Sequence, residues 1–257
     1  MWKTYAYIIS FLILPGTSTI MAQIQPEDSV LIPLKIRAGI EVSGPIIYLT
    51  GKNNLSTEGY ISVDLNEKLC LYAGVGYSKF KYSQYNYSYQ NKGIFFKTGI
   101  DINLLKPEIS MGKYWAGIGL RYGLSAYNSE TPSFWYRNYW GTVTSSLGPS
   151  ARMGHFLEFS PGVRAELFRN FSIGWSVSLR RLIYSGTNKD LSPIYFPGYG
   201  NGAKPFSTGI SYFLVFNIPF KKIKVEIKKE IPEEVEETDR GERIYPEARD
   251  TDRIEKK

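Results

Sequence analysis

The chain has 257 residues, of which 43% are hydrophobic and 15% aromatic, including 20 tyrosines. One cysteine, Cys70, excludes an intrachain disulfide, and with one histidine, His155, neither a zinc cluster nor another bound cofactor is expected. The formal net charge is +7, but residues 221–257 are nearly charge-balanced, so the positive excess lies in the body of the chain. Because the basic residues of the body alternate with aromatic ones and do not cluster, they favour an anionic lipid surface over nucleic acid as a partner.

The first residues have the composition of an export signal. Lys3 is followed by an apolar run over 6–14, a break at Pro15, and a small residue at Ala22. This order predicts a secretory signal peptide over 1–22, followed by an extended periplasmic leader over 23–33. Beyond the N-terminus, no window holds the ~18 uncharged apolar residues that a spanning helix needs.

Eight segments of the body alternate between large apolar residues and small or polar ones. In the clearest of them, Tyr114, Ile118 and Leu120 alternate with Gly117 and Arg121. A period of two residues indicates a β-strand with two unlike faces. The predicted strands cover 34–42, 60–65, 69–78, 94–103, 114–125, 157–167, 171–180 and 206–220.

The last segment, 206–220, resembles a known assembly signal. At about 3.3 Å per residue it spans roughly 45–50 Å, enough to cross a hydrocarbon layer at a tilt. Its pattern Ser207-x-Gly209-x-x-Tyr212-x-Leu214, closed by Phe220, resembles the C-terminal signal of bacterial outer-membrane β-barrels. Over 34–220 the design is similar to the small eight-stranded outer-membrane barrels of Gram-negative bacteria. The resemblance implies an all-β, antiparallel, up-and-down transmembrane barrel, surrounded by outer-membrane lipid and lipopolysaccharide.

The connections alternate in length, as they do in that class. They are short after the second, fourth and sixth segments, and long over 82–91, 128–152 and 185–205. This places both ends of the barrel in the periplasm. The alternative fold is a secreted soluble β-sandwich. Pro161 falls inside the sixth predicted strand, and Pro45 lies three residues past the predicted end of the first; each would remove a ladder donor from an extended strand, so a bulge or break is expected at each.

One face of the strands carries charges of both signs. An eight-stranded barrel is just wide enough for side chains to fill, and buried charges must be paired, which predicts a lumen plugged by salt bridges. A narrow pore through the same residues is the alternative. The predicted network consists of Lys35, Arg37, Glu41, Asp64, Lys97, Asp101, Arg121, Glu158, Arg164, Glu166 and Arg180.

The sequence offers little for catalysis. Some small outer-membrane barrels modify lipids with a serine and a histidine, and His155, Glu158 and Ser160 are the nearest combination here. Period-two alternation puts Glu158 and Ser160 on the inward face and His155 on the outward face. A protein that is not an enzyme is therefore expected, and a lipid-modifying enzyme is the alternative.

Two segments are candidates for binding a protein partner. The longest predicted loop holds Phe134, Trp135, Tyr136, Tyr139 and Trp140, which either bind a partner or pack over the barrel mouth. The charged tail, 221–257, has too little apolar surface to fold alone and is predicted to be mostly disordered, although its first residues could extend the last strand. It is either a solvated extension or a docking arm. Together these features predict an accessory or scaffold barrel.

Overall fold

The computed structural model describes residues 29–50, 54–186 and 193–227. The predicted signal peptide and most of the charged tail lie outside these residues. Ten strands and two short helices are present in the described part: β1 (Ser29–Glu41), α2 (Ser43–Leu49), β2 (Leu55–Asp64), β3 (Leu69–Gln84), β4 (Tyr87–Asn103), α3 (Pro107–Ser110), β5 (Tyr114–Asn138), β6 (Gly141–Phe168), β7 (Phe171–Tyr184), β8 (Tyr195–Phe196), β9 (Gly200–Asn201) and β10 (Phe206–Glu226).

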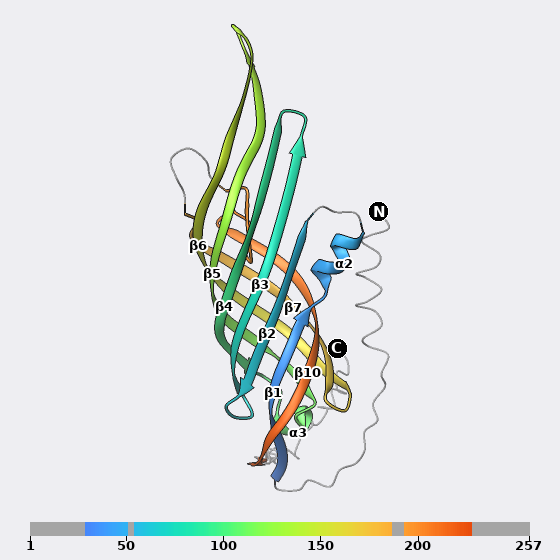
Figure 1. Ribbon diagram of the computed structural model, residues 1–257. Coiled ribbons are helices and arrows are strands. Elements are labelled where there is room, and N and C mark those ends of the chain that lie inside the picture. The colour runs from blue at the N-terminus through green and yellow to red at the C-terminus, as the bar shows by residue number, and fades with distance from the viewer. Residues whose placement is uncertain (1–28, 51–53, 187–192, 228–257) are drawn as a thin grey trace, which may run out of the picture. The chain divides into compact units, whose positions relative to one another are not determined.

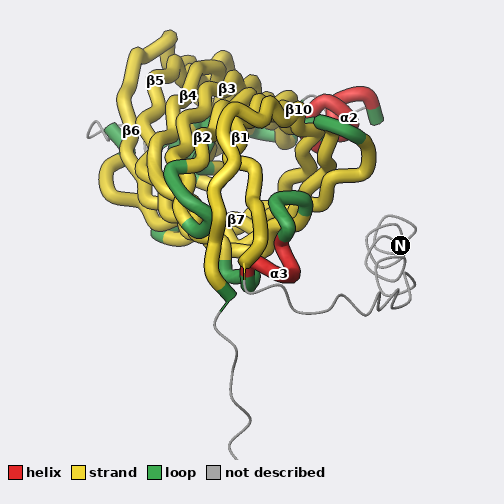
Figure 2. The backbone as a smooth tube through the Cα atoms, turned by 90° about the horizontal axis from the view of Figure 1, so that it is seen from below, coloured by secondary structure: helices red, strands yellow, loops and turns green. Residues whose placement is uncertain are grey.

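Eight of the strands close into a barrel. The order around the ring is β1-β10-β7-β6-β5-β4-β3-β2, and β8 pairs only with β9. Every neighbouring pair of the ring is antiparallel, including the closing pair of β1 with β10. Figure 2 shows this ring from below, with α3 at its rim. The predicted eight-stranded, up-and-down barrel is confirmed, and the soluble sandwich is wrong.

The two faces of the wall differ in polarity. On β3, Leu71, Val75 and Tyr77 point outward and are exposed, while Cys70 and Tyr72 point inward and are buried. The same alternation recurs along β2, where Ile61 is exposed and the flanking Tyr60 and Ser62 are buried. The outward face is therefore apolar and the inward face polar or aromatic.

No helix among the described residues is long and apolar enough to span a membrane.

The first and last barrel strands, β1 and β10, are longer than the sequence predicted, at the start of β1 and the end of β10. β1 begins at Ser29 and β10 runs to Glu226, with Val30 opposite Val225 and Ile32 opposite Ile223. The predicted limits of the barrel, 34 and 220, are therefore too narrow. The strands extend because the alternation of β-branched residues continues past both limits. The expected extension of the last strand beyond Phe220 is thereby confirmed.

Two predicted loops are strands. Residues 82–91 and most of 128–152 belong to the β3–β4 and β5–β6 hairpins, whose turns are only Tyr85-Asn86 and Tyr139-Trp140. Figure 1 shows both hairpins rising well above the rest of the barrel. Below, the end of the barrel with these turns is called the hairpin end, and the opposite end is called the α3 end. The tight turn predicted at Arg169-Asn170 lies at the α3 end, and Asn170 has a φ of 66° there.

The two prolines have different effects. β1 stops before Pro45, which lies in α2, and the Glu41 carboxylate accepts a hydrogen bond from the Gly44 N–H at the start of that helix (3.0 Å). The expected break is confirmed there. Pro161 does not interrupt β6: the pairs Phe159–Leu179 and Gly162–Ser176 keep one register with β7. Only the β7 side of the ladder is lost at Pro161, so no bulge forms.

Candidate functional site

The centre of the barrel is organised around one carboxylate, Glu158 on β6. Its side chain is fully buried, and its carboxylate forms ion pairs with three cations, each on a different strand. Lys97 Nζ lies 2.9 Å and Arg180 Nε 2.8 Å from Oε2, and Arg121 Nη1 lies 3.2 Å from Oε1. A buried carboxylate with this many charged donors has its desolvation cost offset by direct hydrogen bonds.

The network spreads from this carboxylate across the lumen. Arg121 Nη2 contacts Asp101 at 3.0 Å, and the Arg121 guanidinium lies 3.7 Å from the centre of the Tyr72 ring. Lys97 also contacts Glu58 at 2.7 Å, and Glu58 in turn accepts the Tyr72 hydroxyl. Charges of opposite sign therefore alternate across four strands, and each of these cations has a carboxylate partner.

A second group of charges lies nearer the α3 end. Arg37 pairs with Asp64 through two nitrogens, one of them at 2.7 Å, and the Cys70 thiol donates to the same carboxylate at 3.0 Å. Lys35 pairs with Glu166 and donates to the carbonyl of Gly112 at 2.7 Å. These bonds link β1 to β2, β6 and the segment before β5.

Two of the predicted network residues make no ion pair among the described residues. Glu41 is buried and accepts from the Ser43 hydroxyl and the Gly44 N–H. The guanidinium of Arg164 lies 5.2 Å from the centre of the Trp115 ring. The other nine lie in the two groups above. Glu58 was missed because the predicted strand began at residue 60; two more residues of the same alternation would have included it.

The internal spaces beside these groups are small. A cavity of about 30 Å³ adjoins Arg37 and Asp64, and one of about 40 Å³ adjoins Arg121 and Trp175. Each holds a few waters at most. Towards the hairpin end, a more open space of about 260 Å³ lies between Glu41, Glu58 and Arg180.

An aromatic cluster lies inside the lumen towards the hairpin end. The segment carrying β8 and β9 places Phe196 and Tyr199 inside, fully buried against Tyr127 and Phe156. The Phe196 and Tyr199 rings stack at 4.8 Å, and Phe156 lies 5.8 Å from Tyr199. Arg180 Nη1 donates to the Tyr199 carbonyl at 3.2 Å, which joins this cluster to the charged network.

Glycine makes this inward turn of the chain possible. Gly198 and Gly200 have φ values of 76° and 108°, which residues other than glycine rarely adopt. A Cβ on Gly198 would lie 2.6 Å from the Phe95 ring. In the sequence this segment is a Gly- and Pro-rich stretch interleaved with aromatics, a composition that predicts a connection and does not show that the chain folds into the lumen.

The residues considered for catalysis are not brought together. His155 lies on the outward face, where its Nδ1 hydrogen-bonds the Tyr122 hydroxyl at 2.8 Å. Glu158 and Ser160 are buried on the other side of the wall. Within the described residues, no group of acidic, histidine and cysteine side chains is arranged to hold a metal.

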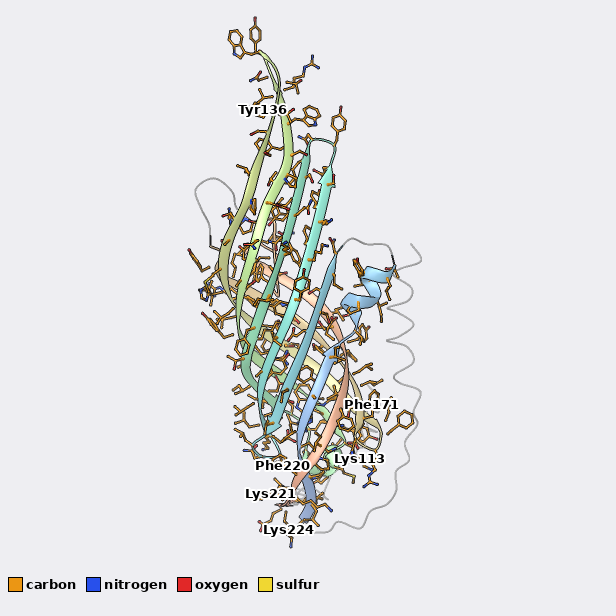
Figure 3. All side chains as sticks on the ribbon, in the orientation of Figure 1. Lys113, Tyr136, Phe171, Phe220, Lys221 and Lys224 are labelled. Carbon is orange, nitrogen blue, oxygen red and sulfur yellow. The ribbon has the colours of Figure 1, made fainter. Side chains whose placement is uncertain are left out.

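The aromatic residues of the β5–β6 hairpin lie far from the barrel mouth. Tyr139 and Trp140 form the turn and are 93% and 88% exposed, with their rings in edge contact at 5.2 Å. Trp135 packs on Tyr85 of the neighbouring hairpin, 5.0 Å between ring centres, and Phe134 lies opposite Tyr87. Figure 3 labels Tyr136 near the top of this hairpin and Phe220 at the other end of the barrel.

The closed ring, its apolar outward face and its charged interior define a small outer-membrane β-barrel, because a closed barrel leaves no unpaired backbone towards lipid. The chain belongs to the family described as "Domain of unknown function (DUF6048)", whose sequence model matches residues 4–223. A search of curated proteins finds no match.

Several solved structures are similar to this chain at low sequence identity. The attachment invasion locus protein Ail of Yersinia pestis is 9% identical, with 74% of this chain and 96% of that chain covered and a TM-score of 0.35. Neisserial surface protein A is 13% identical, with 76% and 100% covered and a TM-score of 0.36. CarO of Acinetobacter baumannii is 12% identical, with 74% and 98% covered and a TM-score of 0.34.

Proposed function

We propose that this protein is a non-enzymatic scaffold of the outer membrane, which presents its two tall hairpins to a partner outside the cell while its lumen stays closed. The observation that carries the proposal is the aromatic tip of the β5–β6 hairpin. Tyr139 and Trp140 are almost fully exposed at the end of an antiparallel ladder, which is regular from the pair Phe134–Ser145 up to the turn and has register shifts below it, between Ser129 and Phe134. Large aromatic side chains are the residues that most often dominate the affinity of protein interfaces.

The hairpin itself suits this role. The ladder between β5 and β6 continues to the pair Asn138–Gly141, and Trp135 Nε1 donates to the Tyr85 carbonyl of the β3–β4 hairpin at 3.1 Å. A support held by backbone and side-chain hydrogen bonds keeps the tip ordered before binding. Less conformational entropy is then lost when a partner binds, which raises affinity.

The interior supports a scaffold more than a transporter. The charged network crosses the middle of the barrel, and the Phe196 and Tyr199 rings narrow the hairpin end above it. We therefore place the function on the outer surfaces. The hairpin end is assigned to the cell exterior because the two projecting hairpins and the long connection from β7 to β10 lie there, and the longer extensions face outward in this class; the α3 end is then assigned to the periplasm.

Site-specific photo-crosslinking in intact cells tests the hairpin role. A photoreactive amino acid replaces Trp140 in one variant and the lipid-facing Leu71 in a control. We expect discrete adducts with an extracellular protein from position 140 and none of these adducts from position 71. Absence of adducts at position 140, or the same adducts at both positions, would contradict the proposal.

A second docking element is proposed in the tail. Since β10 uses residues up to Glu226, the candidate arm for a periplasmic partner begins after Ile227. A chain ending at Ile227 should insert into the membrane normally and lose periplasmic proteins that co-purify with the full chain. If the shortened chain retains all of them, the tail is a solvated extension.

A further inference from the structure

Two lysines face each other on the outer wall of the barrel. Lys79 of β3 and Lys92 of β4 are directly opposite in the ladder, and both side chains are exposed. Residues so placed have Cβ atoms about 5 Å apart, and like charges at this spacing repel. Among the described residues, neither lysine forms an ion pair. Glu130, opposite Gln90, is the acidic neighbour on this face and is not bonded to either lysine.

The lysine pair lies directly above the apolar belt. The next outward pair towards the α3 end is Tyr77 with Ile94, both exposed. Two residues along a strand correspond to about 6.6 Å. The ammonium groups therefore reach the level where the hydrocarbon layer gives way to lipid head groups.

A groove on the same outer surface is lined by Lys92, the member of the pair on β4, and Lys79 lies beside it on β3. The groove has a volume of about 660 Å³. Two rows of outward residues define it across the strands: Lys92, Asn128 and Ala151 in the upper row, and Ile94, Ala126 and Met153 in the lower row. The small residues Ala126 and Ala151 form the depression, because their neighbours Ile94 and Met153 project further. The groove thus has a cationic and polar upper end and an apolar lower end.

We propose that this surface, here called the lysine groove, binds the phosphorylated lipid A part of lipopolysaccharide. A phosphate between Lys79 and Lys92 replaces their repulsion with two charge-assisted contacts, and an acyl chain lies over Ala126 between Ile94 and Met153. The volume is in the range of small-molecule sites. The choice of lipid A rests on the proposed orientation: with the hairpin end outside the cell, the groove faces the outer leaflet. The lipid proposal does not depend on whether the hairpins bind a protein partner.

Binding of defined lipids to the purified full-length protein tests the proposal, with retained lipid counted by native mass spectrometry. The probes are bisphosphorylated lipid A, the same lipid without phosphates, phosphatidylglycerol and inorganic phosphate. The test variant is Lys79→Gln with Lys92→Gln, and the matched control is Lys68→Gln with Lys113→Gln, two exposed lysines nearer the α3 end. A third variant, Ala126→Trp, fills the groove and keeps both charges.

We expect the wild type to prefer bisphosphorylated lipid A, and the Lys79/Lys92 variant to bind it about tenfold more weakly, as the loss of two exposed charge contacts implies. Ala126→Trp should also weaken binding, and the control should not. The lipid-free Lys79/Lys92 variant should be at least as stable as the wild type, because a repulsion is removed.

Equal binding by the wild type and the Lys79/Lys92 variant would overturn the proposal, and so would equal binding of lipid A without phosphates. Equal or tighter binding of phosphatidylglycerol would assign the site to a glycerophospholipid and contradict the choice of lipid A. Competition by inorganic phosphate alone at the same concentration would reduce the site to an anion site without a lipid. None of these results bears on the crosslinking at Trp140, so the two proposals fail separately.

Discussion

At the scale of single residues, Glu158 is the side chain on which the interior depends most. Three cations from β4, β5 and β7 converge on its two oxygens. Lys97 and Arg121 each have a second carboxylate, Glu58 and Asp101, whereas Arg180 pairs with Glu158 alone among the described residues. Removing the charge of Glu158 therefore leaves Arg180 without a counter-ion and weakens the other two pairs.

Glu158→Gln should lower the free energy of unfolding by about 3–5 kcal/mol, because it leaves buried cations uncompensated. Heat-modifiable migration after urea titration measures this loss in the refolded protein. Glu226→Gln, which removes an exposed carboxylate at the end of β10, is the matched control and should unfold like the wild type. An unchanged midpoint for Glu158→Gln would show that the network contributes little to stability.

The charged interior was predictable from period-two alternation, and its pairing was not. The inward parity of Arg121 and Glu158 follows from the apolar residues that flank them on each strand. Which cation meets which carboxylate depends on the stagger between neighbouring strands, such as Arg121 opposite Glu158, and one sequence holds no signal for that register.

At the scale of elements, this barrel has two features beyond a plain ring of eight strands. They are the two tall hairpins and the segment carrying β8 and β9, here called the inward segment, which folds into the lumen. The ends of both hairpins lack a strand signal in the sequence, because residues 81–86 and 141–148 are exposed on both faces. With no buried face, the strand lacks the apolar alternation that identifies one. The inward segment was missed for a different reason: Phe196 and Tyr199 are buried by a fold-back of the chain, which no local pattern encodes.

Gly198→Ala should loosen the inward segment. The added methyl meets the Phe95 ring and forces an unfavourable positive φ, so the stacked Phe196 and Tyr199 should leave their positions more often. Hydrogen exchange at the amides of 195–201 should become faster while the barrel strands stay protected. Gly148→Ala, whose added methyl meets nothing within 4 Å, is the control and should exchange like the wild type. Unchanged exchange in Gly198→Ala would mean that the segment is not held by this close contact.

The last residues of β10, 221–226, should contribute to barrel stability. A chain ending at Phe220 loses the partners of residues 29–34 on β1, whereas a chain ending at Ile227 keeps them. We expect a lower unfolding midpoint and faster proteolysis near Ser29 for the shorter chain only. Equal midpoints for the two chains would restore the narrower barrel limits that the sequence alone indicated.

At the scale of the whole molecule, closure of the ring separates an apolar outer face from a charged interior. Its eight strands leave no free sheet edge in the lipid-facing wall, and the interior holds ion pairs at mid-height and a cluster of aromatic rings towards the hairpin end. The closed, eight-stranded antiparallel ring was predictable, because eight alternating segments and a C-terminal barrel signal agree. Function was predictable only as a choice between an accessory or scaffold barrel, a narrow pore and a lipid-modifying enzyme, since none of these changes the alternation.

Planar-bilayer recording of the purified full-length protein tests the closed lumen most directly. We expect no stable, stepwise conductance from the wild type, because the Glu158 network and the Phe196–Tyr199 stack occupy successive levels of the barrel. Stable conductance steps from the wild type, with a size that changes in Arg121→Ala, would contradict it and make the protein a narrow pore.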